Sequence, residues 1–194
     1  MFLHFRKQFP QLNQNWDKYL PFQQRLEIPA KTVLLKEGQV SQNYISIEQG
    51  CVRAYFDKDG NEKTLLFFFE NDGFSLFDSF VNEVPSQFTI ETIERSVLYL
   101  LPRIHVLQLI EDLSHEPSFM QMLLKISAER HKRYNNELIS FIRDAPEQRY
   151  ERLLTERPHI IRRVQQHYIA SYLGVSTVHL SRIKGKLARG ADHF

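Results

Sequence analysis

The side chains best suited to specific chemistry lie in one segment of this sequence, from Val164 to Leu187. Two runs of apolar residues in this segment have helical spacing, which predicts two helices with inward apolar faces. These residues are Ile169, Ala170 and Leu173 in the first run and Leu180, Ile183 and Leu187 in the second. Gly174 suits the left-handed conformation of a tight turn, and Ser176 suits the N-cap of the second helix. The segment therefore predicts a helix-turn-helix.

The outer face of the second predicted helix carries side chains that could read DNA. They are Thr177, Val178, His179, Arg182 and Lys186. An arginine can donate paired hydrogen bonds to guanine, and valine or threonine methyl groups can contact a thymine methyl. Gln165, Gln166 and Lys184 are better placed for phosphate contacts, which orient a protein on DNA without reading its sequence. The alternative is an ordinary helical hairpin with a solvated basic face.

The distribution of charge favours the DNA-binding interpretation. Residues 145–194 contain nine Lys and Arg against four Asp and Glu, a net charge of +5. Residues 1–144 contain 16 against 19, a net charge of −3. This asymmetry is expected if only the C-terminal part meets a polyanion.

Several other classes of protein are disfavoured by the composition. Cys51 is the only cysteine, so this chain's own thiols cannot form a disulfide or hold an iron–sulfur cluster. The histidines lack the i, i+4 pairing of a metal-binding helix, and we expect no metal site. No nucleophile elbow, Gly-rich phosphate loop or HExxH motif is present, which argues against an enzyme.

No apolar run in the sequence approaches the length of a membrane helix. A membrane-spanning helix needs about 18 or more apolar residues. The first ten residues contain His4, Arg6 and Lys7 but no apolar block of the signal-peptide type. We therefore expect a cytoplasmic protein without a membrane partner.

The first hundred residues have the pattern of a β domain. After an opening helix at Asn13–Leu20, short β-rich runs alternate with turns such as Gln49-Gly50 and Asp59-Gly60. The predicted strands are Leu26–Leu35, Asn43–Glu48, Cys51–Asp57, Lys63–Phe69, Gln87–Ile93 and Val97–Leu101. Strands at this spacing indicate a sandwich, jelly roll or barrel.

A helical pattern returns after Pro102 and continues in a long helix over Glu116–Arg143. Residues in this helix alternate at spacings of four and three, which predicts a dimerisation seam with a polar middle. They are Met120, Leu124, Ser127, His131, Tyr134, Leu138 and Phe141. An adjacent stripe of Phe119, Leu123 and Ile126 could pack on the β domain, and the alternative is that both stripes are intrachain core. Asp144-Ala145-Pro146 is expected to end the helix.

The order of these parts resembles the Crp/Fnr family of bacterial regulators. The resemblance covers nearly the whole chain and depends on five matching segments. They are Leu34–Gly38, Tyr44–Arg53, the turn at Asp59-Gly60, Asn71–Phe74 and Val175–Ile183. It implies an α+β fold with a cyclic-nucleotide-binding-type jelly roll (1–115), a dimerisation helix (116–143) and a winged helix-turn-helix (144–194).

The function implied by the resemblance is sequence-specific regulation of transcription. Such a homodimer would place its two recognition helices in successive major grooves of a pseudo-palindromic operator, with RNA polymerase as a further partner. The alternative is a ligand-binding or protein-interaction module with the same barrel and no specific DNA target. Where members of the family have an Arg-Glu pair in the recognition helix, this sequence has Thr177-Val178, so an operator sequence cannot be transferred.

The expected effector pocket departs from the cyclic AMP pattern of the family. Leu76 and Phe77 stand in place of a Gly-Glu pair, and Gln87 and Phe88 stand where an arginine is expected for the cyclic phosphate. We therefore expect no cyclic AMP and no other cofactor. The candidate pocket residues are Tyr55, Phe74, Ser75, Leu76, Phe77, Asp78, Gln87, Phe88 and Thr89. The pocket either holds a more apolar effector or is filled by its own side chains.

Overall fold

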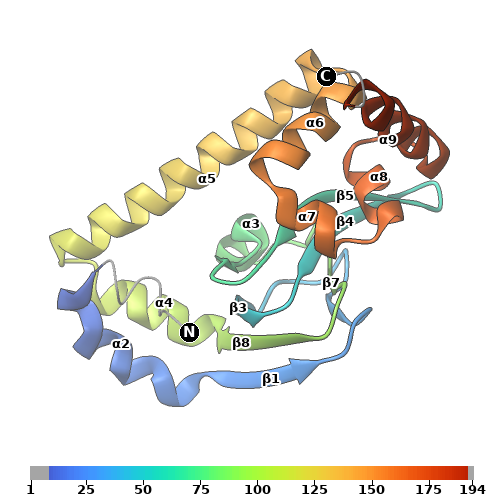
Figure 1. Ribbon diagram of the computed structural model, residues 1–194. Helices are drawn as coiled ribbons and strands as arrows, with labels where there is room; N and C mark the ends of the chain where they lie inside the picture. The colour runs from blue at the N-terminus through green and yellow to red at the C-terminus, as the bar shows by residue number, and fades with distance from the viewer. Residues whose placement is uncertain (1–8, 192–194) are drawn as a thin grey trace. The chain divides into compact units, whose positions relative to one another are not determined.

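Figure 1 shows the computed structural model of the protein, which describes residues 9–191. The first eight residues of the N-terminal segment and the last three of the predicted DNA-binding domain lie outside the described residues. Contacts divide the chain into two compact units. Among the described residues, the first unit holds 9–56 and 66–128, and the second holds 57–65 and 129–191.

The first unit is built on two four-stranded sheets. One sheet has the order β1-β8-β3-β6, and the other has the order β2-β7-β4-β5. The strands are β1 (Gln24–Ile28), β2 (Val33–Leu35), β3 (Asn43–Gln49), β4 (Val52–Lys58), β5 (Asn61–Phe68), β6 (Gly73–Phe74), β7 (Thr89–Thr92) and β8 (Ser96–Pro102). The strands pair antiparallel where β1 and β3 meet β8 and where β2 and β4 meet β7. Antiparallel sheets in the N-terminal part, with most helices after them, confirm the predicted α+β class.

The core of the sheets includes alternate residues on neighbouring strands. Val52 and Ala54 on β4 contribute to it, as do Leu66 and Phe68 on β5. Phe68 stacks on Phe74, with ring centroids 4.1 Å apart. Residues two positions apart in a strand point to the same face of the sheet, which lets these side chains share one core.

One predicted strand was wrong. The run Leu26–Leu35 forms two strands, β1 and β2, which belong to different sheets. Pro29 lacks a backbone N–H for ladder pairing, and Lys31 has a positive φ of 61°, so the chain turns between them. The short strand β6 and the helix α3 (Phe77–Asn82) were not predicted.

A buried ion pair joins β4 to β7. Arg53 and Glu91 are directly opposite in the strand register. The Nη2 and Nε atoms of Arg53 lie 2.7 and 2.9 Å from one carboxylate oxygen of Glu91. The Arg53 guanidinium also lies 3.9 Å from the centre of the Tyr55 ring, and only 2% of its side chain is exposed.

Helices pack into a second apolar cluster in the first unit. The opening helices are η1 (Pro10–Leu12), α2 (Asn13–Tyr19) and η2 (Leu20–Phe22), followed after β8 by α4 (Arg103–Asp112). Trp16 and Leu113 are almost fully buried there against Phe119, which lies on the long helix α5 (Pro117–Arg143). Leu123 and Ile126 of α5 pack against the same cluster.

The second unit is mainly helical. Beyond α5 it contains α6 (Pro146–Glu156), α7 (Pro158–Arg163), α8 (Gln166–Tyr172) and α9 (Thr177–Ala191). The predicted helix break is present, because Ala145 is extended and Pro146 is the first residue of α6. The side chain of Gln148 accepts the Ala145 N–H at 2.8 Å and caps α6. No strand follows β8 within residues 9–191, so the expected wing is not found in that range.

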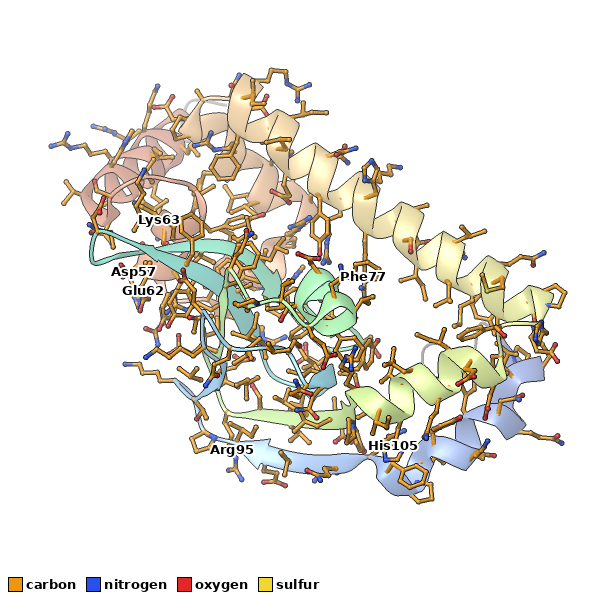
Figure 2. The ribbon with its side chains drawn as sticks, turned by 180° about the vertical axis from the view of Figure 1, so that it is seen from behind. Asp57, Glu62, Lys63, Phe77, Arg95 and His105 are labelled. Carbon is orange, nitrogen blue, oxygen red and sulfur yellow. The ribbon has the colours of Figure 1, made fainter. Side chains whose placement is uncertain are left out.

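The tip of the β4–β5 hairpin, residues 57–65, belongs to the helical unit. Asp59 and Gly60 both have positive φ, as the predicted two-residue turn requires. Ser171 of α8 holds this tip: its hydroxyl donates to the Glu62 carbonyl at 2.7 Å and accepts the Thr64 N–H at 2.9 Å. Figure 2 labels Glu62 and Asp57 on this hairpin.

None of the helices in the described range is both long enough and apolar enough to span a bilayer.

Candidate functional site

The α8–α9 pair has a dense apolar interior. Ile169, Ala170 and Leu173 on α8 and its end are each at most 2% exposed. Leu180 and Ile183 on α9 are each 1% exposed, and Leu187 is half-buried. The predicted inward faces are therefore buried as expected, while Tyr168 and Tyr172 add buried positions that the spacing did not single out.

The turn between α8 and α9 has the predicted chemistry. Gly174 has a φ of +68°, the left-handed conformation that side chains resist. The Val175 N–H donates to the Ala170 carbonyl at 3.0 Å. The Ser176 hydroxyl accepts the His179 N–H at 3.1 Å, which makes Ser176 the N-cap of α9. This cap defines Thr177 as the first residue of α9.

The candidate DNA-reading side chains lie together on the solvent side of α9. The exposed set consists of Thr177, Val178, His179, Arg182 and Lys186. Val178, His179 and Arg182 line a surface cavity of about 660 Å³ beside the helix. Of the candidate phosphate contacts, Gln165 and Gln166 at the start of α8 are exposed, and Lys184 is half-buried.

Glu147 is a charged neighbour of this face that the sequence did not reveal. Its carboxylate lies 3.1 and 3.2 Å from the Nζ atom of Lys186. Arg189, one turn beyond Lys186, lines the same cavity. A basic last turn of α9 could have indicated Arg189, whereas no local signal links Glu147 to a lysine 39 residues away.

The candidate effector residues divide between a cavity and other places. Phe74, Ser75 and Leu76 line a cavity of about 510 Å³ inside the first unit, together with Ile45 and Leu100. Its remaining walls come from β2, β7 and the segment 39–43. Charged side chains are absent among the described residues that line it. The cavity therefore offers apolar surface and neutral polar groups.

The other six candidates do not line this cavity. Phe77 at the start of α3 is 72% exposed (Figure 2), and Gln87 is also exposed. Asp78 accepts a hydrogen bond from the Asn82 side chain at 2.7 Å. Phe88 lies 6.5 Å from Phe56 between ring centroids.

The last two candidates, Thr89 and Tyr55, make contacts within the β-sheet structure of the first unit. The Thr89 hydroxyl accepts the Glu37 N–H at 3.1 Å. Tyr55 stacks against Arg53. The structure therefore brings together only three candidates in this cavity, Phe74 at the end of β6 and the next two residues, Ser75 and Leu76.

The seven predicted seam residues of α5, Met120 through Phe141, are all exposed. Leu124 is 68% exposed and Leu138 is 60% exposed. Ile142, next to the predicted seam, is 80% exposed. This apolar row is separate from the stripe of Phe119, Leu123 and Ile126, which is covered within the chain.

No group of three or more His, Cys, Asp or Glu side chains suited to a metal ion occurs in the described range.

Comparison with known proteins agrees with this architecture. Residues 25–112 match the family model of the cyclic nucleotide-binding domain. No curated protein sequence matches the chain significantly.

Three solved structures illustrate the likeness of fold. The c-di-GMP-responsive global regulator CLP of Xanthomonas campestris has 18% identity and a TM-score of 0.71, over 92% of this chain and 93% of CLP. FixK2 of Bradyrhizobium japonicum has 16% identity and a TM-score of 0.69, over 87% and 86%. The Thermus thermophilus catabolite activator protein has 24% identity and a TM-score of 0.53, over 92% and 84%. Residues 25–112 thus match the cyclic nucleotide-binding domain, and the chain has the fold of the Crp/Fnr transcriptional regulators.

Proposed function

We propose that this protein is a cytoplasmic, homodimeric, sequence-specific DNA-binding regulator of transcription that does not respond to cyclic AMP. The observation that carries the proposal is the exposed face of α9. A capped helix N-terminus presents Thr177, Val178, His179 and Arg182 to solvent, while Leu180 and Ile183 anchor the helix from behind. This is the arrangement of a recognition helix in a helix-turn-helix.

Each of three successive segments of the chain has its own role in this proposal. Residues 1–115 form the sensor domain, 116–143 the dimerisation helix and 144–194 the DNA-binding domain. The charge of residues 145–194, +5, supports contact with DNA phosphates. Arg182 reads guanine, Val178 and Thr177 contact a thymine methyl, and Gln165, Gln166 and Lys184 contact the backbone.

Dimerisation is supported by the exposed apolar row on α5. Two copies of this helix would bury Leu124, Leu138 and their neighbours against each other. The twofold symmetry would place two copies of α9 in successive major grooves, about 34 Å apart. The operator is then a pseudo-palindrome, and RNA polymerase is the further partner.

An apolar effector is favoured over both cyclic AMP and a filled pocket. The cavity beside Phe74, Ser75 and Leu76 has room for a small ligand. Its uncharged walls offer no guanidinium to a cyclic phosphate, and burying an unpaired phosphate is costly. CLP is described as responsive to c-di-GMP, and the same argument disfavours that ligand in this cavity.

The test is selection of random genomic fragments by the purified protein at about 0.15 M salt, where specific sites outcompete non-specific ones. Enrichment of an inverted repeat without added nucleotide supports the proposal. The matched control is Arg182→Ala, which should relax the preference at one base pair of the repeat while still binding random DNA. The selection is repeated after adding the small molecules of a cell extract. If the wild-type protein enriches no sequence in either selection, the interaction-module alternative is preferred.

A further inference from the structure

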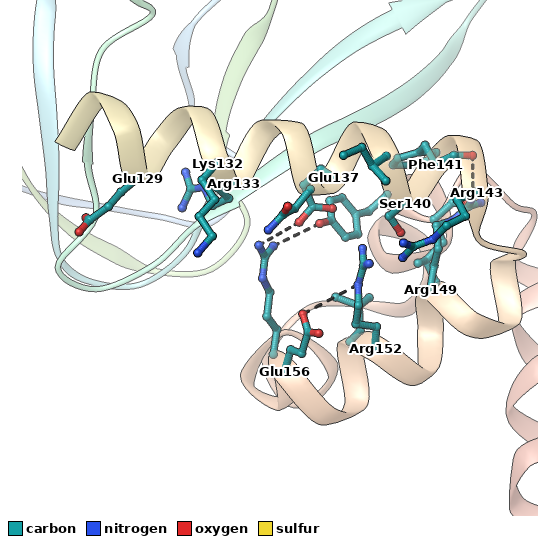
Figure 3. Close-up of a pocket in the computed structure, with 16 residues that line it drawn as sticks. Glu129, Lys132, Arg133, Glu137, Ser140, Phe141, Arg143, Arg149, Arg152 and Glu156 are labelled. Carbon is teal, nitrogen blue, oxygen red and sulfur yellow. Dashed lines mark hydrogen bonds and ion pairs between the residues drawn. The ribbon is translucent and has the colours of Figure 1, made fainter. Parts of the chain in front are cut away.

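A second cavity lies wholly within the helical unit, away from the jelly-roll cavity. It has a volume of about 530 Å³, which is within the range of small-molecule sites. Residues of α5 from Glu129 to Arg143 form one wall, and the other consists of α6 residues together with Arg157, Tyr172 and Leu173. Figure 3 shows Arg152 of α6 extending toward α5 across this space. We refer to it as the α5–α6 pocket.

Cations outnumber anions around the α5–α6 pocket. Its walls include six cations: Lys132, Arg133, Arg143, Arg149, Arg152 and Arg157. Three carboxylates line it, those of Glu129, Glu137 and Glu156. A fourth, Asp144, pairs with Arg143 at 2.7 Å and with Arg152 at 3.2 Å. Two positive charges are therefore left in excess.

Arg149 is the cation with the least compensation. Its guanidinium donates to the backbone carbonyls of Leu173 at 2.6 Å, Asp144 at 3.1 Å and Phe141 at 3.4 Å. No carboxylate of the described residues lies within ion-pair distance, and its buried Nε has no hydrogen-bond partner. Desolvation by burial lowers the pKa of this guanidinium, and the negative charge of Asp144 offsets this shift only in part.

Lys132 is the second cation without an ion pair. It is exposed on the opposite wall, and no carboxylate of the described residues lies within ion-pair distance. Arg152 and Arg157 complete the walls with side chains that are each 29% exposed. Partly buried guanidinium groups form stronger charge-assisted hydrogen bonds than solvated ones.

We propose that the α5–α6 pocket binds a small organic polyanion bearing phosphate or carboxylate groups, which regulates DNA binding by the protein. Such a ligand would place one charged group near Arg149 and Arg152 and another near Lys132. It would thereby connect α5 to α6 across the helix break at Asp144-Ala145-Pro146. The regulatory part rests on the proposed DNA-binding function, whereas the binding site itself does not.

Most of the α5 side of the pocket lies off the proposed dimer seam, and Phe141 belongs to both. Its residues Glu129, Arg133, Asn136, Ser140 and Arg143 repeat at spacings of four and three. Each residue of this stripe comes two positions after a residue of the exposed apolar seam. The two stripes are therefore separated by an angle of about 160° around the helix axis. A DNA duplex cannot enter a cavity of this size, which favours a small anion.

Calorimetric titration of the full chain with inorganic pyrophosphate tests the site. The titration is made without divalent cations and at constant ionic strength. The wild-type protein should bind one pyrophosphate per chain saturably. Lys132→Gln and Arg152→Gln should each weaken binding about tenfold, the usual effect of one lost charge-assisted bond. Arg152→Lys, which keeps the charge but loses the planar fork, should bind with intermediate affinity.

Two controls separate this site from general charge attraction. Lys125→Gln removes an exposed cation of the same helix that does not line the pocket, and Arg182→Gln removes one from the α9 face. Both should bind pyrophosphate as the wild type does. Absence of saturable binding, or equal weakening by these controls, would overturn the site. Thermal unfolding of each variant verifies that it is folded.

A second arm tests regulation. The affinity for the selected operator is measured by fluorescence anisotropy with and without pyrophosphate at one ionic strength. We expect a change of at least about fivefold in the wild type, typical of allosteric coupling, and none in Lys132→Gln. An unchanged affinity would overturn the regulatory part. A protein that binds no DNA at all would overturn the proposed function, and calorimetry would still decide the site.

Discussion

The Nζ atom of Lys186 on α9 lies 3.1 Å from a carboxylate oxygen of Glu147 on α6. Both side chains are exposed, so the pair contributes little to stability. The position of this ion pair is important, because Lys186 is one of the cations expected to contact DNA. A carboxylate held there competes with a DNA phosphate for the same ammonium group.

Glu147→Gln should therefore strengthen binding to all DNA sequences and steepen its salt dependence. Lys186→Ala should weaken binding to all sequences alike and reduce the salt slope by about one. Anisotropy titrations on a random duplex over a range of salt concentrations measure both effects. In the double variant the gain from Glu147→Gln should disappear. An undiminished gain would indicate a general charge effect.

Arg182→Ala should lower the affinity for the operator by about 1–3 kcal/mol and relax the preference at one base pair. The reason is the loss of a bidentate contact, which carries sequence information that a phosphate contact does not. Competition between operators substituted at each position would measure this change. Equal losses on operator and random DNA would exclude Arg182 from base readout.

Leu138→Asp should convert the dimer to a monomer. The substitution puts a charge in the exposed apolar row of α5, where a second copy would bury it. Sedimentation equilibrium gives the mass directly. The matched control is Lys125→Asp, an exposed site on the same helix outside the row. A Leu138→Asp variant that stays dimeric would place the interface elsewhere.

Gly174→Ala should reduce the free energy of unfolding by about 1–2 kcal/mol, the cost of a left-handed conformation for a residue with a Cβ. An added Cβ would lie 3.4 Å from a ring carbon of Phe141, so crowding adds little. Gly174→Asn should cost less, since asparagine tolerates this conformation. Urea denaturation compares the variants, and equal losses for both would show that crowding dominates.

Glu91→Gln should destabilise the jelly-roll unit by about 3–5 kcal/mol, because it leaves the buried Arg53 charge uncompensated. Replacing both partners, as Arg53→Met with Glu91→Leu, should restore most of the loss. Denaturation of the three variants checks this. A double variant as unstable as Glu91→Gln would mean that the ion pair itself stabilises the sheet.

The features that could be predicted from the sequence are those set by near neighbours. The α8–α9 turn depends on Gly174 and Ser176, whose effects are local, and the inward spacing of Leu180 and Ile183 follows from helix geometry. The split between β1 and β2 is not visible in the apolar pattern, because β-forming residues continue on both sides of Pro29.

Features that depend on distant pairs could not be predicted. Arg53 and Glu91 are 38 residues apart and meet only through the register of β4 and β7. The cations of the α5–α6 pocket lie on α5, on α6 and at Arg157 directly after α6, so they converge only when these helices pack together. Most of the candidate effector residues are neighbours in the chain, but successive residues of a strand point to opposite faces. Tyr55 therefore lies against Arg53 and does not line the cavity.

The hairpin tip held by Ser171 makes the chain cross between its two units at three places, after residues 56, 65 and 128. A gene fragment that begins at residue 144 would encode α6 to α9 but would leave the Ser171 hydroxyl without Glu62 and Thr64. Grafting a different C-terminal half onto this barrel would break the same two bonds. The hairpin and α8 must therefore be exchanged together in any chimeric regulator, and sequence changes in one constrain those tolerated in the other.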